Sequence, residues 1–240
     1  RMDLPNLFSK STAQSAQELM LSLLLSGSQV QALLLRLSTT GVQVRVASKK
    51  LAYTTLEDCV AKADECLLQL GKEAESANEV IFGVPSSWVQ MGELADLKKP
   101  VIKKITQDLS LEPLGFVDVA EIVVQQELAK NSLYSGLVIF LDDKDITVTF
   151  VNQGSFVTTE KVGRSADFGS DLHELIARLK SIAEHRSVYL PSQVLLASFD
   201  LTEGELQEFQ QIAYADALGT NKSFLQPPII GVLASEELVD

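Results

Sequence analysis

The chain has 240 residues, of which 46% are hydrophobic, and its formal net charge is −12. This length and apolar share support one large domain or two lobes with buried cores, and they exclude a disordered chain. The acidic balance argues against a nucleic-acid partner, because affinity for phosphate backbones comes mainly from lysine and arginine. With two cysteines and two histidines there is no Cys/His cluster, so we expect no bound metal.

The first half of the chain predicts three strands, a helix and a strand. Residues 1–17 are polar and indicate a flexible N-terminal arm. The apolar run that follows is too short to span a bilayer and reads as a buried strand. In order, the predicted elements are strands at 19–25, 30–37 and 42–53, a helix from Thr54 or Thr55 to residue 74 with Cys59 and Cys66 as core thiols, and a strand at 79–85.

The second half repeats this pattern after a helix at 100–109, a strand at 114–119, a helix at 120–130 and a short polar linker at 131–135. Its predicted elements are three strands between 137 and 162, a helix at 170–184, a strand at 192–197, a helix that begins near residue 203 and a last strand at 229–233. We therefore predict an α/β fold of two duplicated βββαβα lobes around a central cleft, with lobe I at 18–133 and lobe II at 134–240.

Three short motifs carry a resemblance to a known family. Residues 26–32 (SGSQVQA) resemble a Gly-Ser/Thr-x-x-Val-Lys-Ala turn, 119–121 (VAE) a Val-x-Glu-Pro step, and 145–148 (DITV) a Thr-Asp-Ile-x-Val hairpin. In this order they resemble the FtsA/PilM branch of the actin-like ATPase superfamily, whose lobes are ribonuclease H-like. Residues 86–99 leave little room for the subdomain that FtsA proteins insert, which implies a compact variant closer to PilM or to GspL-type cytoplasmic domains.

The same resemblance implies that the nucleotide loops are degenerate. An Asp-x-Gly turn is expected in the first hairpin, a lysine on its second strand, a second glycine turn near residue 142, and a Gly-Gly step after residue 197. The positions that depart from this pattern are Leu24, Ser26, Ser28, Gln31, Asp142, Asp143, Asp145, Ser198 and Phe199. Two carboxylates in the second turn would repel a polyanion, and Phe199 has the size to fill the space of an adenine. We therefore expect no cofactor and no catalytic residue, that is, a pseudo-ATPase and not an enzyme.

The leading functional hypothesis is an actin-like cytoplasmic scaffold domain in a bacterial membrane-associated assembly, such as type IV pilus assembly, type II secretion or cell division, that does not bind ATP. The alternative is an ATP-binding ATPase of the FtsA/PilM type that switches or polymerises with nucleotide. This alternative applies if the loops align with the family motifs a few residues away from the positions given above, with Asp142 or Asp143 as a ligand of Mg²⁺.

A candidate partner surface is the basic helix face formed by Lys98, Lys99, Lys103 and Lys104, with Trp88 nearby in sequence. Against a net acidic chain, this face fits an acidic protein partner or an anionic membrane, so peripheral membrane association at the inner face and an oligomer stay open. The simpler interpretations are a solvated helix face and a tryptophan that covers the edge of the core, and they are favoured.

Overall fold

The computed structural model describes residues 18–38, 41–142, 144–198, 202–218, 224 and 226–233. The predicted arm at 1–17 lies outside the described residues, as do Asp143 and Phe199. No helix in the described part of the chain combines the length and the apolar composition of a membrane span.

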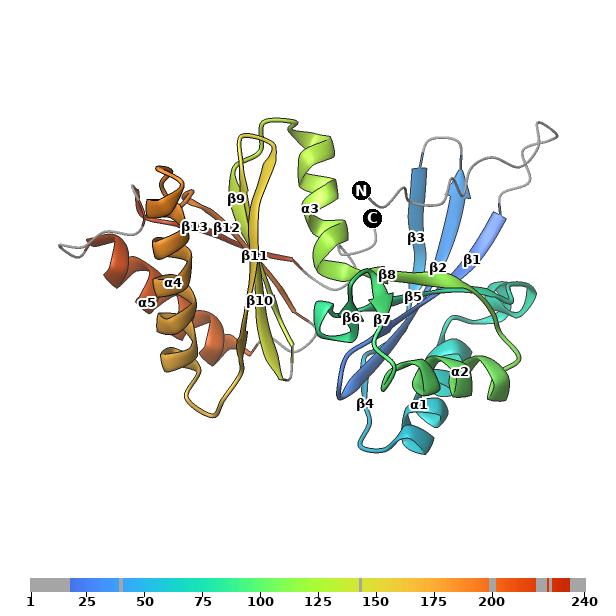
Figure 1. Ribbon diagram of the computed structural model, residues 1–240. Helices are drawn as coiled ribbons and strands as arrows, with labels where there is room; N and C mark the ends of the chain where they lie inside the picture. Colours follow the sequence, from blue (N-terminus) through green and yellow to red (C-terminus); the bar gives the residue numbers. More distant parts are fainter. Residues whose placement is uncertain are drawn as a thin grey trace.

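The first half of the chain builds a mixed sheet in the strand order β3-β2-β1-β5-β8, with β4 also paired to β2 (Figure 1). Strands β1 to β3 form an antiparallel meander, whereas β5 and β8 run parallel to β1. The elements are β1 (Glu18–Leu25), β2 (Gln29–Ser38), β3 (Gly41–Ala47), β4 (Leu51–Ala52), α1 (Leu56–Gln69), η1 (Lys72–Ser76), β5 (Glu79–Val84), η2 (Ser86–Trp88), β6 (Val89–Gln90), β7 (Glu93–Leu94), α2 (Lys99–Asp108), β8 (Glu112–Asp118) and α3 (Val119–Lys130).

The second half builds a second sheet in the order β11-β10-β9-β12-β13. Its elements are β9 (Gly136–Leu141), β10 (Asp145–Asn152), β11 (Ser155–Gly163), α4 (Phe168–His185), β12 (Gln193–Ser198), α5 (Glu203–Leu218) and β13 (Ile229–Leu233). In each sheet, a three-stranded antiparallel meander is extended by two strands parallel to its first strand. The identical strand order confirms the predicted α/β duplication; we call the two halves lobe I and lobe II, and their boundary at 133/134 stays a prediction.

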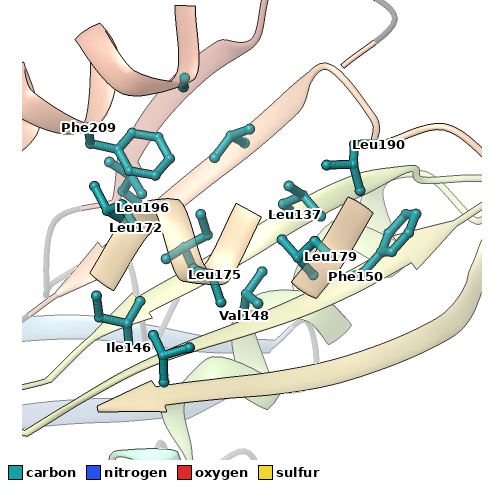
Figure 2. Close-up of a cluster of buried hydrophobic side chains, with 14 of the residues drawn as sticks. Leu137, Ile146, Val148, Phe150, Leu172, Leu175, Leu179, Leu190, Leu196 and Phe209 are labelled. Atoms are coloured by element: carbon teal, nitrogen blue, oxygen red, sulfur yellow. The ribbon is translucent and has the colours of Figure 1, made fainter. Parts of the chain in front are cut away.

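Along β1 and β9 the side chains point alternately to the two faces of the sheet, and this separates the hydrophobic core into three clusters. In β9, Leu137, Ile139 and Leu141 face α4 and α5. Figure 2 shows this cluster, in which Leu172, Leu175 and Leu179 of α4 lie over Ile146, Val148 and Phe150 of β10. An equivalent cluster in lobe I joins Leu21, Leu23 and Leu25 of β1 to the apolar side chains of α1 and α2.

The remaining side chains of these strands meet in a third cluster that both lobes share. Met20 and Leu24 of β1 belong to this cluster, as do Val138 and Phe140 of β9. The first two turns of α3 add their own apolar side chains, Val119, Ala120, Val123 and Val124. Because strand neighbours point to opposite faces, each sheet is buried on both faces here.

The linker after α3 is fastened to the turn between β10 and β11. The amide of Gly154 donates to the Tyr134 carbonyl at 2.9 Å, and the amide of Gln153 donates to Ser135 Oγ at 2.7 Å. Gly154 has φ +75°, and a Cβ there would lie 2.0 Å from the carbonyl oxygen of Ser132. This close approach requires a glycine at residue 154.

Two predicted elements end earlier than expected. The third strand stops at Ala47, because Ser48 turns its hydroxyl and carbonyl groups toward β2. Helix α1 stops at Gln69 instead of residue 74, and Gly71, with φ +81°, starts the separate 3₁₀ helix η1.

Candidate functional site

In Figure 1, both hairpin turns that the sequence singled out lie at the lower ends of the strands that they join, one in each lobe. The first joins β1 to β2, and the second joins β9 to β10. Helix η2 follows β5, which pairs with β1 through Gly83 and Leu24, and Ser87 of η2 donates a hydrogen bond of 2.5 Å to Asp142 Oδ2. This bond links lobe I to the second turn.

In the first turn, backbone amides form hydrogen bonds to acceptors within the turn itself. Ser26 Oγ accepts from the amides of Ser28 at 3.2 Å and Gln29 at 2.9 Å, while the Ser26 amide donates to the Gln29 carbonyl at 2.9 Å. The Tyr53 hydroxyl donates to the Ser26 carbonyl. A phosphate-binding turn needs backbone N–H groups that point at the ligand, and these three amides point back into the turn.

Leu24 and Gln31 belong to the interior. Leu24 is 1% exposed and packs so tightly on Gly83 that a Cβ on that glycine would lie 2.4 Å from Leu24 Cδ2. Gln31 is also buried, and its Nε2 donates to the Ser48 carbonyl at 2.9 Å. The side chain that stands at the lysine position therefore holds the end of β3 and does not face solvent.

The second turn is held from three sides. Asp142 is 5% exposed and donates its amide to the Asp145 carbonyl, and Arg164 Nη1 donates to the Asp142 carbonyl at 2.7 Å. Arg164 also forms an ion pair with Glu205 of α5, and Asp145 pairs with Lys161 at 2.9 Å. Of the two carboxylates predicted at this turn, Asp142 is buried and accepts the Ser87 hydroxyl; Asp143 lies outside the described residues.

The end of β12 lies beside the second turn. Ser198 is buried, and its Oγ donates to the Leu141 carbonyl at 3.0 Å. The prediction that Phe199 fills an adenine site concerns a residue outside the described part.

Helix η2 carries a second serine–carboxylate pair that the sequence did not reveal. Ser86 Oγ donates to Asp118 Oδ1 at 2.8 Å, and the same oxygen accepts the amide of Ala120 at the start of α3. Burial raises the pKa of Asp118, opposed by the hydrogen bond from Ser86. Pro85-Ser86-Ser87 after an apolar strand was the available signal, because the carboxyl ends of parallel strands gather at one edge.

The predicted partner surface is only partly present. Trp88 is 2% exposed and belongs to the core of lobe I, with Lys98 Nζ 4.3 Å from its ring centroid. Including it in an exposed surface was wrong, and the core-edge interpretation holds. Lys99 pairs with Asp96 at 2.8 Å and Lys104 with Asp108 at 2.9 Å, so neighbouring carboxylates offset much of the basic face.

A cavity of about 370 Å³ lies at the other end of the second sheet. Ser135, Asn152, Tyr189, Pro191 and Gln226 line it. Since β9 begins next to Ser135 and ends at Leu141, this cavity is separated from Asp142 by the length of the strand. It does not correspond to the predicted nucleotide position.

No protein-family model matches the chain, and no curated protein matches it. Its fold is similar to that in a solved PilM–PilN type IV pilus biogenesis complex, with a TM-score of 0.58 and 13% identity over 92% of this chain and 93% of that one. It is also similar to a Bacteroides thetaiotaomicron protein with an actin-like ATPase fold and unknown function (TM-score 0.53, 8% identity, 90% of this chain and 91% of that one). A third similar structure is an exopolyphosphatase from Cytophaga hutchinsonii (TM-score 0.52, 10% identity, 75% of this chain and 67% of that one).

These likenesses confirm the predicted fold: the chain has the actin-like ATPase fold, with a PilM-type neighbour. The exopolyphosphatase overturns the prediction that the chain is not an enzyme. That prediction inferred loss of catalysis from altered loops alone, whereas an enzyme shares the fold over most of this chain. At 10% identity the likeness is one of fold.

Proposed function

We propose that this chain is an actin-like protein-binding domain of a membrane-associated assembly, acting on the cytoplasmic side, and that its two hairpin turns do not hold MgATP. The observation that carries the second part is the use of the turn amides. In the first turn, the amides of Ser26, Ser28 and Gln29 are bonded within the turn. A phosphate would have to replace bonds that the chain already makes.

The second turn also argues against a bound phosphate, because a buried carboxylate occupies the position where the phosphate would lie. Asp142 is buried against Ser87, so a phosphate at this point would meet a carboxylate in place of an N–H donor. Two unit charges about 4 Å apart repel by roughly 4 kcal/mol at an effective dielectric of 20. The hydrogen bond between the lobes would also have to break.

A protein-binding role is favoured by the solved PilM–PilN complex, in which a protein with a similar fold assembles with a partner in type IV pilus biogenesis. The choice among pilus, secretion and division assemblies rests on that likeness alone. The proposed cytoplasmic location rests on the same likeness, because Cys59 and Cys66 lie seven residues apart on α1 and are too far apart to form a disulfide in any compartment.

The test is titration calorimetry of the whole chain with MgATP at millimolar concentration, with phosphate release from ATP and from polyphosphate measured on the same sample. We expect no saturable heat with MgATP. Saturable binding would overturn the non-nucleotide part and favour the nucleotide-switch alternative, especially if Ser87→Ala, which removes the Ser87 hydrogen bond to Asp142, changes the affinity. Phosphate release would identify a catalytic activity of the chain.

The basic face is tested with vesicles of phosphatidylglycerol and phosphatidylcholine in equal parts. Lys103 is exposed, so Lys103→Glu should weaken co-sedimentation at low salt by up to about 1 kcal/mol if this face contacts the membrane surface. Lys72→Glu, also an exposed lysine of lobe I but on η1, is the matched control. Equal binding of both variants and the unmodified chain would remove the face from the proposed partner surface.

A further inference from the structure

The strands that end the two sheet orders, β3, β8, β11 and β13, differ in how they are protected from pairing with another chain. Natural proteins protect such edges with charged side chains, prolines and bulges. β3, β8 and β11 each show a register irregularity, and each carries charged residues. β13 pairs with β12 in a regular register and has the sequence IIGVL, without a charge or a proline.

The backbone of β13 offers hydrogen-bonding groups to its open side. The amide of Ile229 donates to the Ser192 carbonyl at 2.7 Å, so residue 229 points toward β12. Backbone groups alternate along a strand, so the N–H and C=O of Ile230 and Val232 point away from β12. Among the described residues, no strand pairs with this side, because β13 ends the sheet order (Figure 1).

Apolar side chains at this edge are exposed on both faces of the sheet. Ile229 is 69% exposed and Val232 is 46% exposed. Their positions differ by three residues, so they point to opposite faces. In contrast, Ile230 packs against the core under α4 and α5, and Leu233 packs against the shared cluster. An added strand covers both exposed side chains only if it is apolar on both of its faces.

The charge of the chain near β13 in sequence indicates whether a second copy of this chain or a segment of another protein would pair with the strand. From residue 200 to the end of the sequence there are eight carboxylates and one lysine, Lys222. Pairing two β13 strands of identical chains would bring two such acidic regions together, which is unfavourable. A segment with lysine or arginine on both sides of its apolar residues would be attracted instead.

We propose that β13 is a strand-addition site, at which an extended apolar segment of a partner protein, flanked by basic residues, extends the second sheet. This inference rests on the proposed protein-binding function, because it names the site and the chemistry of the partner. Main-chain bonds to Ile230 and Val232 give the affinity, and contacts to Ile229 and Val232 give the preference for apolar residues.

The test uses a fluorescein-labelled peptide KKVIVIVKK and measures anisotropy with the whole chain. The control peptides are EEVIVIVEE, which reverses the flanking charge, and KKVIPIVKK, whose proline removes a donor. In the chain, Val232→Pro removes one outward N–H and leaves the inward bonds to β12, because proline is tolerated where the N–H faces away from the sheet. Val232→Ala is its matched control, since it shortens the side chain but keeps the N–H.

We expect KKVIVIVKK to bind, both control peptides to bind at least tenfold more weakly, and Val232→Pro to weaken binding about tenfold relative to Val232→Ala. If Val232→Pro does not fold, Val232→Lys replaces it and should weaken the binding of the lysine-flanked peptide. The same change on the opposite edge strand, Phe156→Lys, should leave binding unchanged, because Phe156 is 51% exposed on β11.

Three results would overturn the inference. One is equal affinity of Val232→Pro and Val232→Ala; another is concentration-dependent dimerisation that Val232→Pro abolishes, which would make a second copy the occupant. The third is peptide binding only after removal of residues 234–240, which would make that segment the occupant. Saturable MgATP binding with intact peptide binding would overturn the nucleotide part of the proposed function and leave the strand-addition site standing.

Discussion

Side-chain hydroxyl groups do much of the bonding at the ends of the two sheets. Ser26 closes the first turn, Ser86 and Ser87 hold one carboxylate each, and Ser198 binds the end of β9. Tyr134 is the exception, because its buried hydroxyl has no hydrogen-bond partner among the described residues, and burial raises its pKa to about 12. An unpartnered buried hydroxyl costs stability.

Tyr134→Phe should therefore stabilise the chain. The phenylalanine ring has the same shape as the tyrosine ring, so the substitution removes the unsatisfied hydroxyl and leaves the packing in place. We expect the free energy of unfolding to rise by about 1 kcal/mol. Urea unfolding measures it. Tyr53→Phe is the control in the opposite direction, because the Tyr53 hydroxyl donates to Ser26 and its loss should destabilise. A loss of stability in Tyr134→Phe would show that the hydroxyl has a partner after all.

Asp118 gives a pH dependence whose sign is fixed. Its pKa in the folded chain lies above the ordinary value of 3.8, so folding favours the protonated form. Its contribution to stability is full below pH 3.8 and is lost as the pH rises through the folded pKa. The free energy of unfolding of the unmodified chain, minus that of Asp118→Asn, should therefore increase as the pH falls from 7 toward 4. A difference that is constant with pH would contradict the shift.

At the scale of elements, periodicity predicted most of the fold, whereas the partners of polar side chains stayed hidden. The apolar stripe of α4 and the strand runs around 19–25 and 137–141 are local patterns, and they predicted elements at the right places. The sequence indicated only that Gln31 replaces an expected lysine. In the structure the Gln31 side chain donates a hydrogen bond to the carbonyl of Ser48, 17 residues away. For Trp88 the sequence left an exposed loop position and a place at the core edge open and favoured the second, and the structure places the ring in the core of lobe I. The ion pairs of Lys99 and Lys104 depend on side-chain geometry.

The start of α1 shows how the structure decides an alternative that the sequence left open. Thr55, and not Thr54, is the N-cap: its Oγ1 accepts the Asp58 amide at 3.1 Å, and Asp58 Oδ2 accepts the Thr54 amide at 3.0 Å. Thr55→Ala should lower the free energy of unfolding by about 1 kcal/mol. Thr54→Ala, measured in the same denaturation series, should stay within about 0.5 kcal/mol of the unmodified chain. Equal losses in both variants would mean that the cap bond adds nothing.

At the scale of the whole molecule, the shared cluster makes the two lobes depend on each other. Leu24 of β1 and Phe140 of β9 are each 1% exposed within it. Two lobes joined only by a linker would unfold separately, but here each lobe completes the core of the other. We therefore expect one cooperative transition.

Phe140→Ala tests this dependence. We expect a loss of about 3 to 5 kcal/mol, because the ring is fully buried. Fluorescence of Trp88 reports on lobe I, and hydrogen exchange of the α4 amides reports on lobe II. Both midpoints should fall together, although the substitution is in lobe II. Leu68→Ala, 74% exposed on α1, is the control and should change little. A midpoint that shifts in α4 alone would show that the lobes unfold independently.

The fastened linker determines how α3 connects the two lobes. Because Gly154 and Gln153 bind the backbone of Tyr134 and the hydroxyl of Ser135, residues 134–135 must move with the β10–β11 turn. The start of α3 is held as well, because Asp118 Oδ1 accepts the Ser86 hydroxyl and the Ala120 amide. Helix α3 therefore connects the lobes as a rigid element held at both of its ends, and not as a flexible linker.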